Sequence, residues 1–184
     1  MSKQPTIELR GKKVFLRPPK PADFREFSAL TKASRARYRG FVRNHESRKA
    51  FTDFIRRSRR DDACGFIIRR CADGVIVGSM GLFNIVRLHV QAAFVGYAIG
   101  TPHAQQGYAT EALQLVLRFA FRKLRLHRIE ASIQPHNAPS IALVKRAGFA
   151  REGLARREVK IGGRWRDHER WAILAEDWRP LRRK

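Results

Sequence analysis

The chain has 184 residues, 43% hydrophobic and 30% charged, which is enough to bury the core of one globular domain. Its 39 Lys and Arg residues against 16 Asp and Glu residues give a formal net charge of +23. This excess argues against cationic substrates such as polyamines and predicts an acidic partner, either nucleic acid or, as the weaker alternative, an anionic membrane surface.

The N-terminal third predicts one strand followed by two helices. Residues 6–17 alternate loosely and form the strand, which a cluster of prolines ends. Asp23 caps a helix that runs to about Thr31, and spaced phenylalanines mark a second helix that ends near Arg60. The span 32–60 holds eleven basic and two acidic residues. This density favours a contact surface for RNA or an acidic partner over a helical face that is merely solvated.

The middle of the chain predicts a hairpin, a strand and the most amphipathic helix. Residues 65–71 and 75–83 pair around an Ala-Asp-Gly turn, and residues 90–99 form a further strand. A polar loop that turns on Gly107 leads into a helix over residues 110–124, whose apolar residues recur at helical spacing. This order of elements can hold an anion, because the first N–H groups of a helix lack intrahelical partners and the helix dipole favours negative charge there.

The C-terminal third predicts a strand, a short helix and a second hairpin. Residues 128–134 form the strand, and Asn137 caps a helix over residues 138–147 that a following glycine ends. Residues 149–161 and 164–174 pair around a Gly-Gly turn. We expect the three tryptophans of the chain to pack in the core and across this last hairpin.

Together these elements predict an α/β fold. We expect a mixed, mostly antiparallel, twisted sheet of about seven strands with about four helices and one central βαβ crossover. The whole chain, 1–184, is expected to form a single domain, with its core over about residues 6–178 and a basic C-terminal tail at 179–184.

The remaining residue patterns limit other kinds of site. Cys64 and Cys71 are expected on opposite faces of one strand, so we expect free, reduced thiols. The six histidines show no metal-binding spacing, and we predict no metal site. No stretch approaches the ~20 apolar residues of a membrane helix, and the first residues have no signal-peptide core, so we expect a cytoplasmic protein without a membrane partner.

Motifs in the C-terminal half carry a family resemblance. The segments HRI, PHN with a Ser three residues on, GF and WRDH occur between about Gly78 and Trp178. In this order they resemble the RimJ/RimL-type ribosomal-protein-alanine N-acetyltransferases, the RimJ branch most nearly, within the wider Gcn5-related N-acetyltransferase (GNAT) fold. The resemblance implies acetyl-CoA as donor and the N-terminal Ala or Ser of a ribosomal protein as acceptor. The basic charge would hold such an enzyme near the ribosome and its RNA.

The resemblance also implies where coenzyme A binds. In the family, the pyrophosphate loop usually has Gln or Arg three residues before a glycine, and Gly or Ala two residues after it. Gly107 and Ala109 keep this pattern and Ala104 departs from it. A Cβ at Gly107 would block the close approach of backbone to phosphate, and the splayed strand before the loop binds the pantetheine arm. The expected cofactor-binding residues are Tyr97, Ala98, Ile99, Gln105, Gln106, Gly107, Tyr108, Ala109, Thr110 and Asn137.

The general base of many relatives is missing. They carry a Glu on the strand before the loop, two residues before its glycine, and Phe94 stands there. An α-amine with a pKa of about 7.7–8.0 is already neutral in roughly a tenth of molecules at pH 7, whereas a lysine amine near 10.4 is neutral in less than about one in a thousand. The missing Glu therefore supports an N-terminal acceptor over a lysine side chain.

Two residues are candidates for proton transfer. Glu158 lies near the point where a Glu serves as a proposed base in the RimL branch; an exposed surface role, a water relay and Asp167 remain alternatives. Ser140 is implied to protonate the leaving thiolate, although it also suits the start of a helix. The rival hypotheses are a ribosome-assembly or RNA-binding protein that uses this fold, and a GNAT enzyme that acts on another peptide or on a small amine.

Overall fold

The computed structural model describes residues 7–41 and 46–180. In these ranges eight strands form one sheet of order β1-β2-β3-β4-β5-β6-β8-β7, with β5 and β6 parallel and every other neighbouring pair antiparallel. The predicted α/β class with a mixed, mostly antiparallel sheet is confirmed. The elements are β1 (Leu9–Arg10), β2 (Val14–Arg17), η1 (Pro21–Asp23), α1 (Phe24–Ala33), α2 (Arg48–Arg57), β3 (Ala63–Arg70), β4 (Ile76–Val86), β5 (Ala92–Ile99), η2 (Thr101–His103), α3 (Tyr108–Arg118), η3 (Phe119–Lys123), β6 (Arg128–Ile133), α4 (Ala138–Ala147), β7 (Ala150–Ile161) and β8 (Arg164–Leu174).

The eighth strand comes from the first predicted one, which the structure divides. The Gly11 N–H donates to the Val14 carbonyl at 2.8 Å and closes a tight turn. Leu9 and Arg10 therefore fold back to pair with β2 instead of continuing it. Thr6, where we expected this strand to begin, lies outside the described residues.

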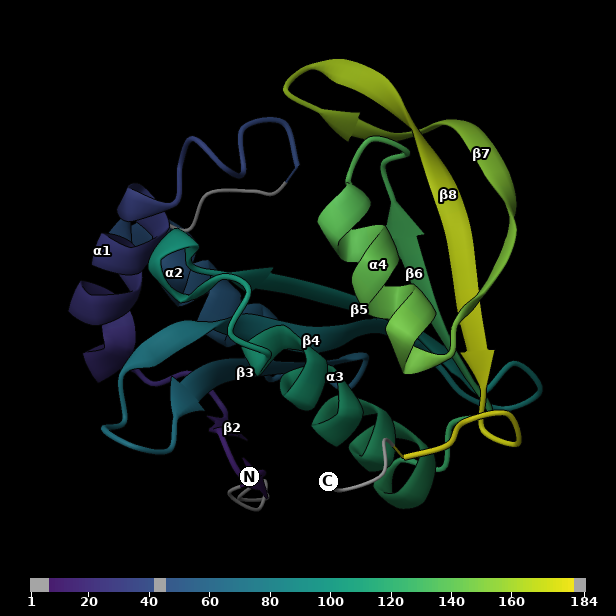
Figure 1. Ribbon diagram of the computed structural model, residues 1–184, viewed down its shortest axis with the longest axis horizontal. Coiled ribbons are helices and arrows are strands. Elements are labelled where there is room, and N and C mark those ends of the chain that lie inside the picture. Colours follow the sequence, from purple (N-terminus) through teal and green to yellow (C-terminus); the bar gives the residue numbers. More distant parts are fainter. Residues whose placement is uncertain (1–6, 42–45, 181–184) are drawn as a thin grey trace.

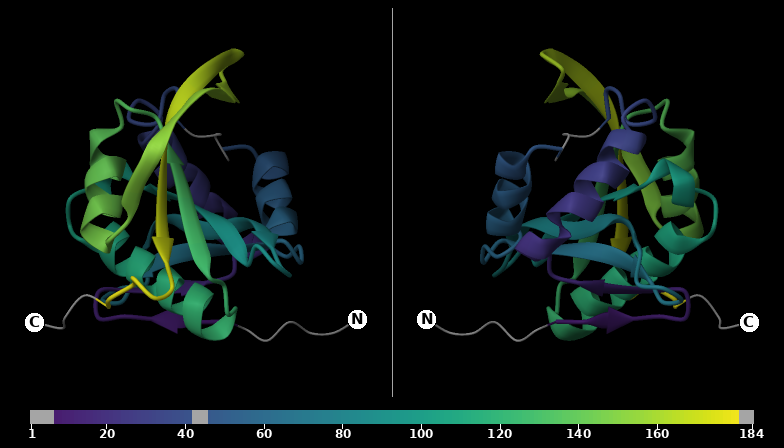
Figure 2. Two further views of the ribbon diagram at one scale, coloured as in Figure 1. Left: turned by 90° about the vertical axis from the view of Figure 1, so that its right-hand side faces the viewer. Right: turned by 90° about the vertical axis from the view of Figure 1, so that its left-hand side faces the viewer.

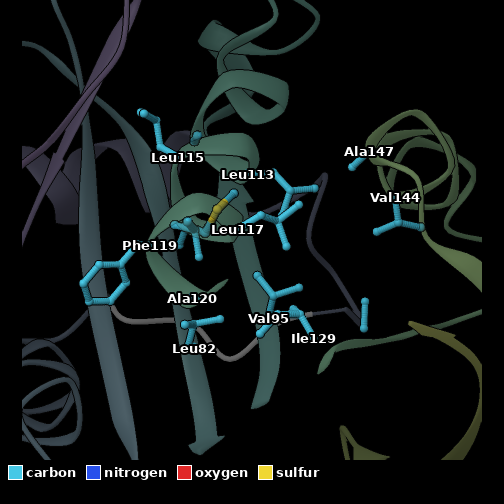
Figure 3. Packing of buried hydrophobic residues seen from close by; sticks show 14 of the residues in the cluster. Leu82, Val95, Leu113, Leu115, Leu117, Phe119, Ala120, Ile129, Val144 and Ala147 are labelled. Carbon is cyan, nitrogen blue, oxygen red and sulfur yellow. The ribbon is translucent and has the colours of Figure 1, made fainter. Parts of the chain in front are cut away.

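The sheet lies between two pairs of helices. Figures 1 and 2 show α1 and α2 on one face and α3 and α4 on the other. Figure 3 shows the larger core, where Leu113 and Leu117 of α3 meet Val95 of β5 and Ile129 of β6. A smaller cluster under α1 and α2 comprises Phe27, Phe51, Ile55, Ile67 and Ile76. Burial on both faces anchors the central strands, which carry the site described below.

The boundaries of α4 match the prediction. Asn137 Oδ1 accepts a hydrogen bond from the Ser140 N–H at 3.3 Å and caps the helix. Gly148 follows the last turn with a left-handed φ of 94°. Both residues act within one helical turn, which is why the sequence alone was enough to place this helix.

Asp23 holds the predicted N-cap position of α1, but its side chain does not cap that helix. No side-chain hydrogen bond caps α1; instead Asp23 accepts from the Lys20 N–H at 2.8 Å and from both terminal nitrogens of Arg17. Arg69 of β3 adds a second ion pair at 3.1 Å. A buried carboxylate binds guanidinium groups more strongly than a single backbone N–H, so Asp23 joins β2 to β3.

The last hairpin and the tryptophans differ partly from expectation. Trp171 and Trp178 are buried, as predicted. Trp165 lies opposite Lys160 in the β7–β8 hairpin, where cross-strand packing was predicted, but 59% of it is exposed and it is not part of the core. The hairpin tip projects beyond the rest of the fold (Figures 1 and 2).

Both cysteines are free. Within residues 7–41 and 46–180, no helix combines the length and the apolar character needed to cross a bilayer.

Candidate active site

A wedge opens between the two parallel strands in the middle of the sheet. β5 pairs with β6 only from Ala92 to Phe94, whereas its pairing with β4 continues to Ile99. Beyond Phe94 one edge of β5 is therefore free of a neighbouring strand. A free strand edge offers a row of N–H and C=O groups to an extended ligand.

The open edge belongs to Ile99 and Tyr97. The Ile99 N–H donates to the Tyr38 hydroxyl at 2.8 Å, and the Tyr38 hydroxyl donates to the Ile99 carbonyl at 2.7 Å. These groups point away from β4, and the alternation of a strand turns those of Tyr97 the same way. Ala98 directs its own groups toward β4, opposite Ser79. The three residues expected to bind pantetheine thus divide into two that line the wedge and one that holds the sheet.

The loop after β5 ends at the N-terminus of α3. Gly107 is the N-cap residue with a left-handed φ of 83°, and Gln105 has a φ of 61°. A Cβ at Gly107 would meet only Lys13 Nζ, at 3.4 Å, so the space in front of the loop is open. The N–H groups of Tyr108, Ala109 and Thr110 begin the helix there. They supply the positive end of a helix dipole at the mouth of the wedge.

Cations surround this helix start, and sequence reasoning missed them. An open pocket of about 450 Å³ is lined by Lys12, Lys13 and Arg70 together with Gln106, Tyr108, Cys71 and Ala72. Lys13 Nζ donates to the Gln106 carbonyl at 3.3 Å. Lys12 and Lys13 are visible in the sequence, but only the β1–β2 turn brings them to a loop 93 residues away. Their charge adds to the helix dipole in attracting a phosphate.

Glu111 fixes that turn against α3. Its carboxylate accepts from the backbone N–H groups of Lys12, Lys13 and Val14 at 2.8, 2.7 and 2.9 Å. The sequence placed Glu111 on the polar stripe of the helix without a partner. Three charge-assisted hydrogen bonds from one turn make it a structural residue that orients the two lysines.

Tyr108 and Arg70 lie at the edge of this pocket. Tyr108 is buried and joins the larger core. Arg70 forms an ion pair with Asp73, and a hydrogen bond from Arg70 lowers the pKa of Asp73 to about 2. Asp73 therefore remains ionised at neutral pH and offsets part of the positive charge of Arg70.

Ser140, in the first turn of α4, meets Tyr97 through its backbone. It is half-buried, and the Tyr97 hydroxyl donates to its backbone carbonyl at 3.5 Å. Burial raises the pKa of Tyr97 to about 12, so this phenol stays protonated at neutral pH. The contact joins β5 to α4 across the opening and brings Ser140 and Asn137 to the same wedge as Tyr97.

Glu158 is turned inward by a β-bulge. The register between β7 and β8 shifts between Ala155 and Val159, and Arg157 adopts a φ of 50°. Glu158 Oε2 accepts from the Ser132 hydroxyl at 2.7 Å, and Oε1 pairs with Arg170. Its side chain is only 17% exposed, which excludes the predicted alternative of an ordinary surface glutamate. No hydrogen bond within the described part of the chain joins it to Ser140.

Asp167 and His168 have structural partners. Asp167 Oδ1 accepts from the Arg157 N–H at 2.7 Å and stabilises the bulge. His168 is buried, with Nδ1 3.1 Å from the Arg166 carbonyl. Adjacent residues of a strand point to opposite sides, and accordingly Asp167 is exposed and His168 buried.

Arg170 links the residues around the missing base. Its guanidinium lies 5.7 Å from the centre of the Phe94 ring and pairs with Glu158 and, at 3.5 Å, with Glu130. Arg170 and Ser132 are opposite each other on β8 and β6. Where many relatives have a carboxylate, this chain places an aromatic ring under an arginine, and the nearest carboxylates belong to other strands.

Arg170 and Glu158 lie on one face of the sheet, and Gly107 and Ser140 lie on the other. Trp171, next to Arg170, points to the opposite face, where the Lys145 ammonium of α4 lies 5.6 Å from its ring centre. Arg170 and Glu158 are therefore on the face away from α4. The wedge joins this face to the helix side, where Gly107 and Ser140 lie. Within the described ranges, no group of three His, Cys, Asp or Glu side chains is placed to hold a metal ion.

Known proteins show where this arrangement recurs. The acetyltransferase (GNAT) domain family matches residues 13–150. The "Probable N-acetyltransferase YjcK" of Bacillus subtilis is 37% identical over 177 residues, covering 92% of this chain and 98% of that protein. An Escherichia coli alanine N-acetyltransferase of ribosomal protein uS5 is 39% identical over 107 residues, covering 58% of this chain and 55% of that protein. Mycobacterium smegmatis RimJ, solved in complex with CoA-disulfide, superposes with a TM-score of 0.81 at 29% identity, covering 89% of this chain and 82% of RimJ.

Proposed function

The chain belongs to the acetyltransferase (GNAT) family, and on this premise we propose that it transfers the acetyl group of acetyl-CoA to the α-amine of a ribosomal protein that begins with Ala or Ser. Acetyl transfer with acetyl-CoA as donor is the activity of the family. The acceptor and the roles of single residues are our proposal. We further propose that residues 1–184 act as one acetyltransferase domain.

The wedge between β5 and β6 is the observation that carries the proposal. It combines a free strand edge at Tyr97 and Ile99, a helix N-terminus with a left-handed glycine, and a cationic pocket. These features fit a long ligand with an amide-containing arm and an anionic pyrophosphate. In our proposal the arm lies along Tyr97 and Ile99 and beside Asn137, and the pyrophosphate contacts the N–H groups from Gln105 to Thr110. Lys13 then neutralises phosphate charge, a role that only the structure suggested.

Binding of the arm requires Tyr38 to move. Its hydroxyl occupies both the N–H and the carbonyl of Ile99, which are the groups we assign to the donor. The amide groups of a donor replace the two hydrogen bonds of this hydroxyl, so the exchange is nearly balanced and the other contacts of the donor decide it. An N–H of the same edge is then available to polarise the thioester carbonyl.

Proton transfer is assigned to residues outside β5. Because the α-amine is neutral in roughly a tenth of molecules at pH 7, a strong base is not required. Glu158 is the proposed base, acting directly or through water. Each of its oxygens accepts one hydrogen bond, from Ser132 or from Arg170, and keeps a second lone pair for a relaying water. The Ser140 hydroxyl is the proposed donor to the departing thiolate.

Two observations support a ribosomal acceptor. The E. coli relative acts on ribosomal protein uS5, and the structural neighbour is RimJ. The net charge of +23 suits an enzyme that works on a surface of RNA. The charge alone also suits an RNA-binding protein in which acetyl transfer is secondary, and this is the alternative we retain.

Release of free thiol from acetyl-CoA tests the proposal. The acceptors are peptides copying ribosomal-protein N-termini that begin with Ala or Ser. Each matched control is the same peptide with a blocked N-terminus and an internal lysine, and a polyamine represents small cationic amines. We expect thiol release only with free N-termini. Thiol release with the blocked peptide or with the polyamine would overturn the proposed acceptor. The absence of thiol release with every free N-terminal peptide would overturn it as well.

A further inference from the structure

We propose that the distal half of the β7–β8 hairpin, residues 156–166, is an arm that binds single-stranded RNA. In this arm Trp165 stacks on a base, and the neighbouring cations contact phosphates. RNA binding adds to acetyl transfer and does not depend on it. The arm gives part of the net charge of the chain a specific place and a specific mode of contact.

The shape of the hairpin leaves both of its edges open. β6 ends at Ile133, opposite Glu169, so the remainder of β8 toward the tip has only β7 as a neighbour. Figures 1 and 2 show this part extending beyond the helices and the sheet. A two-stranded ribbon without a third layer is marginally stable alone, so a bound partner that orders it contributes to its stability.

The charge of the arm is uncompensated. Residues 156–166 contain five cations and one carboxylate, and that carboxylate, Glu158, points inward to Ser132 and Arg170. Asp167, at the base of the arm, accepts from a backbone N–H. Among the residues that the structure describes, no cation of the arm forms an ion pair. The five are Arg156, Arg157, Lys160, Arg164 and Arg166.

This differs from arginines elsewhere on the surface. Arg35, Arg56 and Arg60, in the basic N-terminal third, each pair with a nearby carboxylate. Like charges on a narrow ribbon repel each other, and binding an anionic polymer relieves that repulsion. The cations of the ribbon then replace the counterions condensed on the polymer, and the release of these counterions favours binding. Lys49, Arg57 and Arg59 of the N-terminal third are also without an ion pair among the described residues. No tryptophan lies among them, however, so the arm is distinguished by its cations together with Trp165.

Trp165 identifies the kind of anion. Trp171 and Trp178 are 3% and 5% exposed, whereas Trp165 is 59% exposed and lies directly opposite Lys160. Large aromatic side chains are usually buried, and one displayed between cations suits stacking on an unpaired base. An acidic peptide would match the charge and leave the flat ring without a partner. A duplex would hide its bases, so single-stranded RNA fits both features.

Salt dependence tests the phosphate contacts. Binding of a fluorescein-labelled single-stranded oligoribonucleotide to the full chain is measured at several salt concentrations. The slope of log K against log salt is about −0.7 for each phosphate neutralised on a single strand. Combined Lys160→Gln, Arg164→Gln and Arg166→Gln should make the slope shallower by about 2. The matched control, Lys49→Gln with Arg57→Gln and Arg59→Gln on and after α2, removes equal charge and should leave the slope unchanged.

Tryptophan fluorescence tests the stacking. RNA should quench the emission of the wild-type protein, since only Trp165 is well exposed. Trp165→Phe should keep the affinity and abolish the quenching, because phenylalanine also stacks. Trp165→Ala should weaken binding by about 5- to 150-fold. Circular dichroism and thermal unfolding confirm that each variant folds.

Several results would overturn the proposal that the arm binds single-stranded RNA. They are equal losses from the two triple variants, unchanged fluorescence at saturating RNA, or equal affinity for a duplex or an acidic peptide. Acetylation of a free peptide is assayed separately in the absence of RNA. A failure of RNA binding is thereby distinguished from a failure of the proposed acetyl transfer.

Discussion

Replacing Gly107 with alanine tests the donor site, and Gly148 provides a matched control. Both glycines have a left-handed φ, 83° at Gly107 and 94° at Gly148. A Cβ would meet its nearest neighbour at 3.4 Å in each case, Lys13 Nζ in the first and Ile173 Cδ1 in the second. The two substitutions therefore impose the same backbone strain and similar contacts. Only Gly107 lies at the helix N-terminus that we assign to the pyrophosphate.

The strain and the binding effect have separate magnitudes. An alanine in the left-handed region costs about 1–2 kcal/mol of unfolding free energy, which corresponds to a fall in Tm of about 2–8 °C for a chain of this size. Both variants should show it. At Gly107 the Cβ also stands between phosphate and backbone. Losing one charge-assisted hydrogen bond of about 1.5–3 kcal/mol should weaken coenzyme A binding by about 10- to 100-fold.

Calorimetric titration with coenzyme A and thermal unfolding measure the two effects. We expect Gly148→Ala to lose stability and keep its affinity, and Gly107→Ala to lose both. If Gly107→Ala binds coenzyme A as tightly as Gly148→Ala does, the phosphates do not lie at this loop. If only Gly107→Ala loses stability, the strain argument is wrong.

Three further predictions concern protons and stability. Glu158→Gln should lower kcat by about 100-fold or more if Glu158 is the base, while Asp167→Asn, which weakens only the bulge, should leave kcat within a few fold; comparable kcat values in a steady-state assay would exclude Glu158. Ser140→Ala should lower kcat and leave the KM for acetyl-CoA nearly unchanged, and a rise in KM alone would indicate a binding role. Burial opposes ionisation of Asp23, but hydrogen bonds, chiefly from Arg17, outweigh it and hold the pKa of Asp23 below its usual value. Its contribution to stability is therefore present above about pH 4 and lost as the pH falls further, and Asp23→Asn should cost about 3 kcal/mol and flatten this acid limb in denaturant titrations.

Local patterns account for what the sequence predicted correctly. The start and end of α4 follow from Asn137 and Gly148, and Gly107 marks the turn before α3. Each acts through backbone groups within about one turn, so no knowledge of the fold is needed. The order of elements and the downstream motifs then indicated the family, which the comparisons confirm.

Long-range contacts account for what it missed. Asp23 has the residue type of a helix cap, yet an arginine from β3 and another from β2 bind it instead. The β-propensity of Trp165 predicted packing, but the hairpin outruns β6 and leaves the ring in solvent. In both cases a neighbour distant in the sequence, present or absent, outweighed the local preference.

The sequence by itself determined the boundaries of α4 and the glycine turn before α3, and it indicated the family. The tertiary structure decided which partners the candidate site residues have. It brought Lys13 to Gln106, Tyr38 to Ile99, and Glu158 to Ser132 and Arg170. The Lys13–Gln106, Tyr38–Ile99 and Ser132–Glu158 contacts span 93, 61 and 26 residues of sequence. The Glu158–Arg170 pair joins the strands β7 and β8. These contacts depend on strand register, a bulge and the crossing of α3 over the sheet, which form only when the whole core packs.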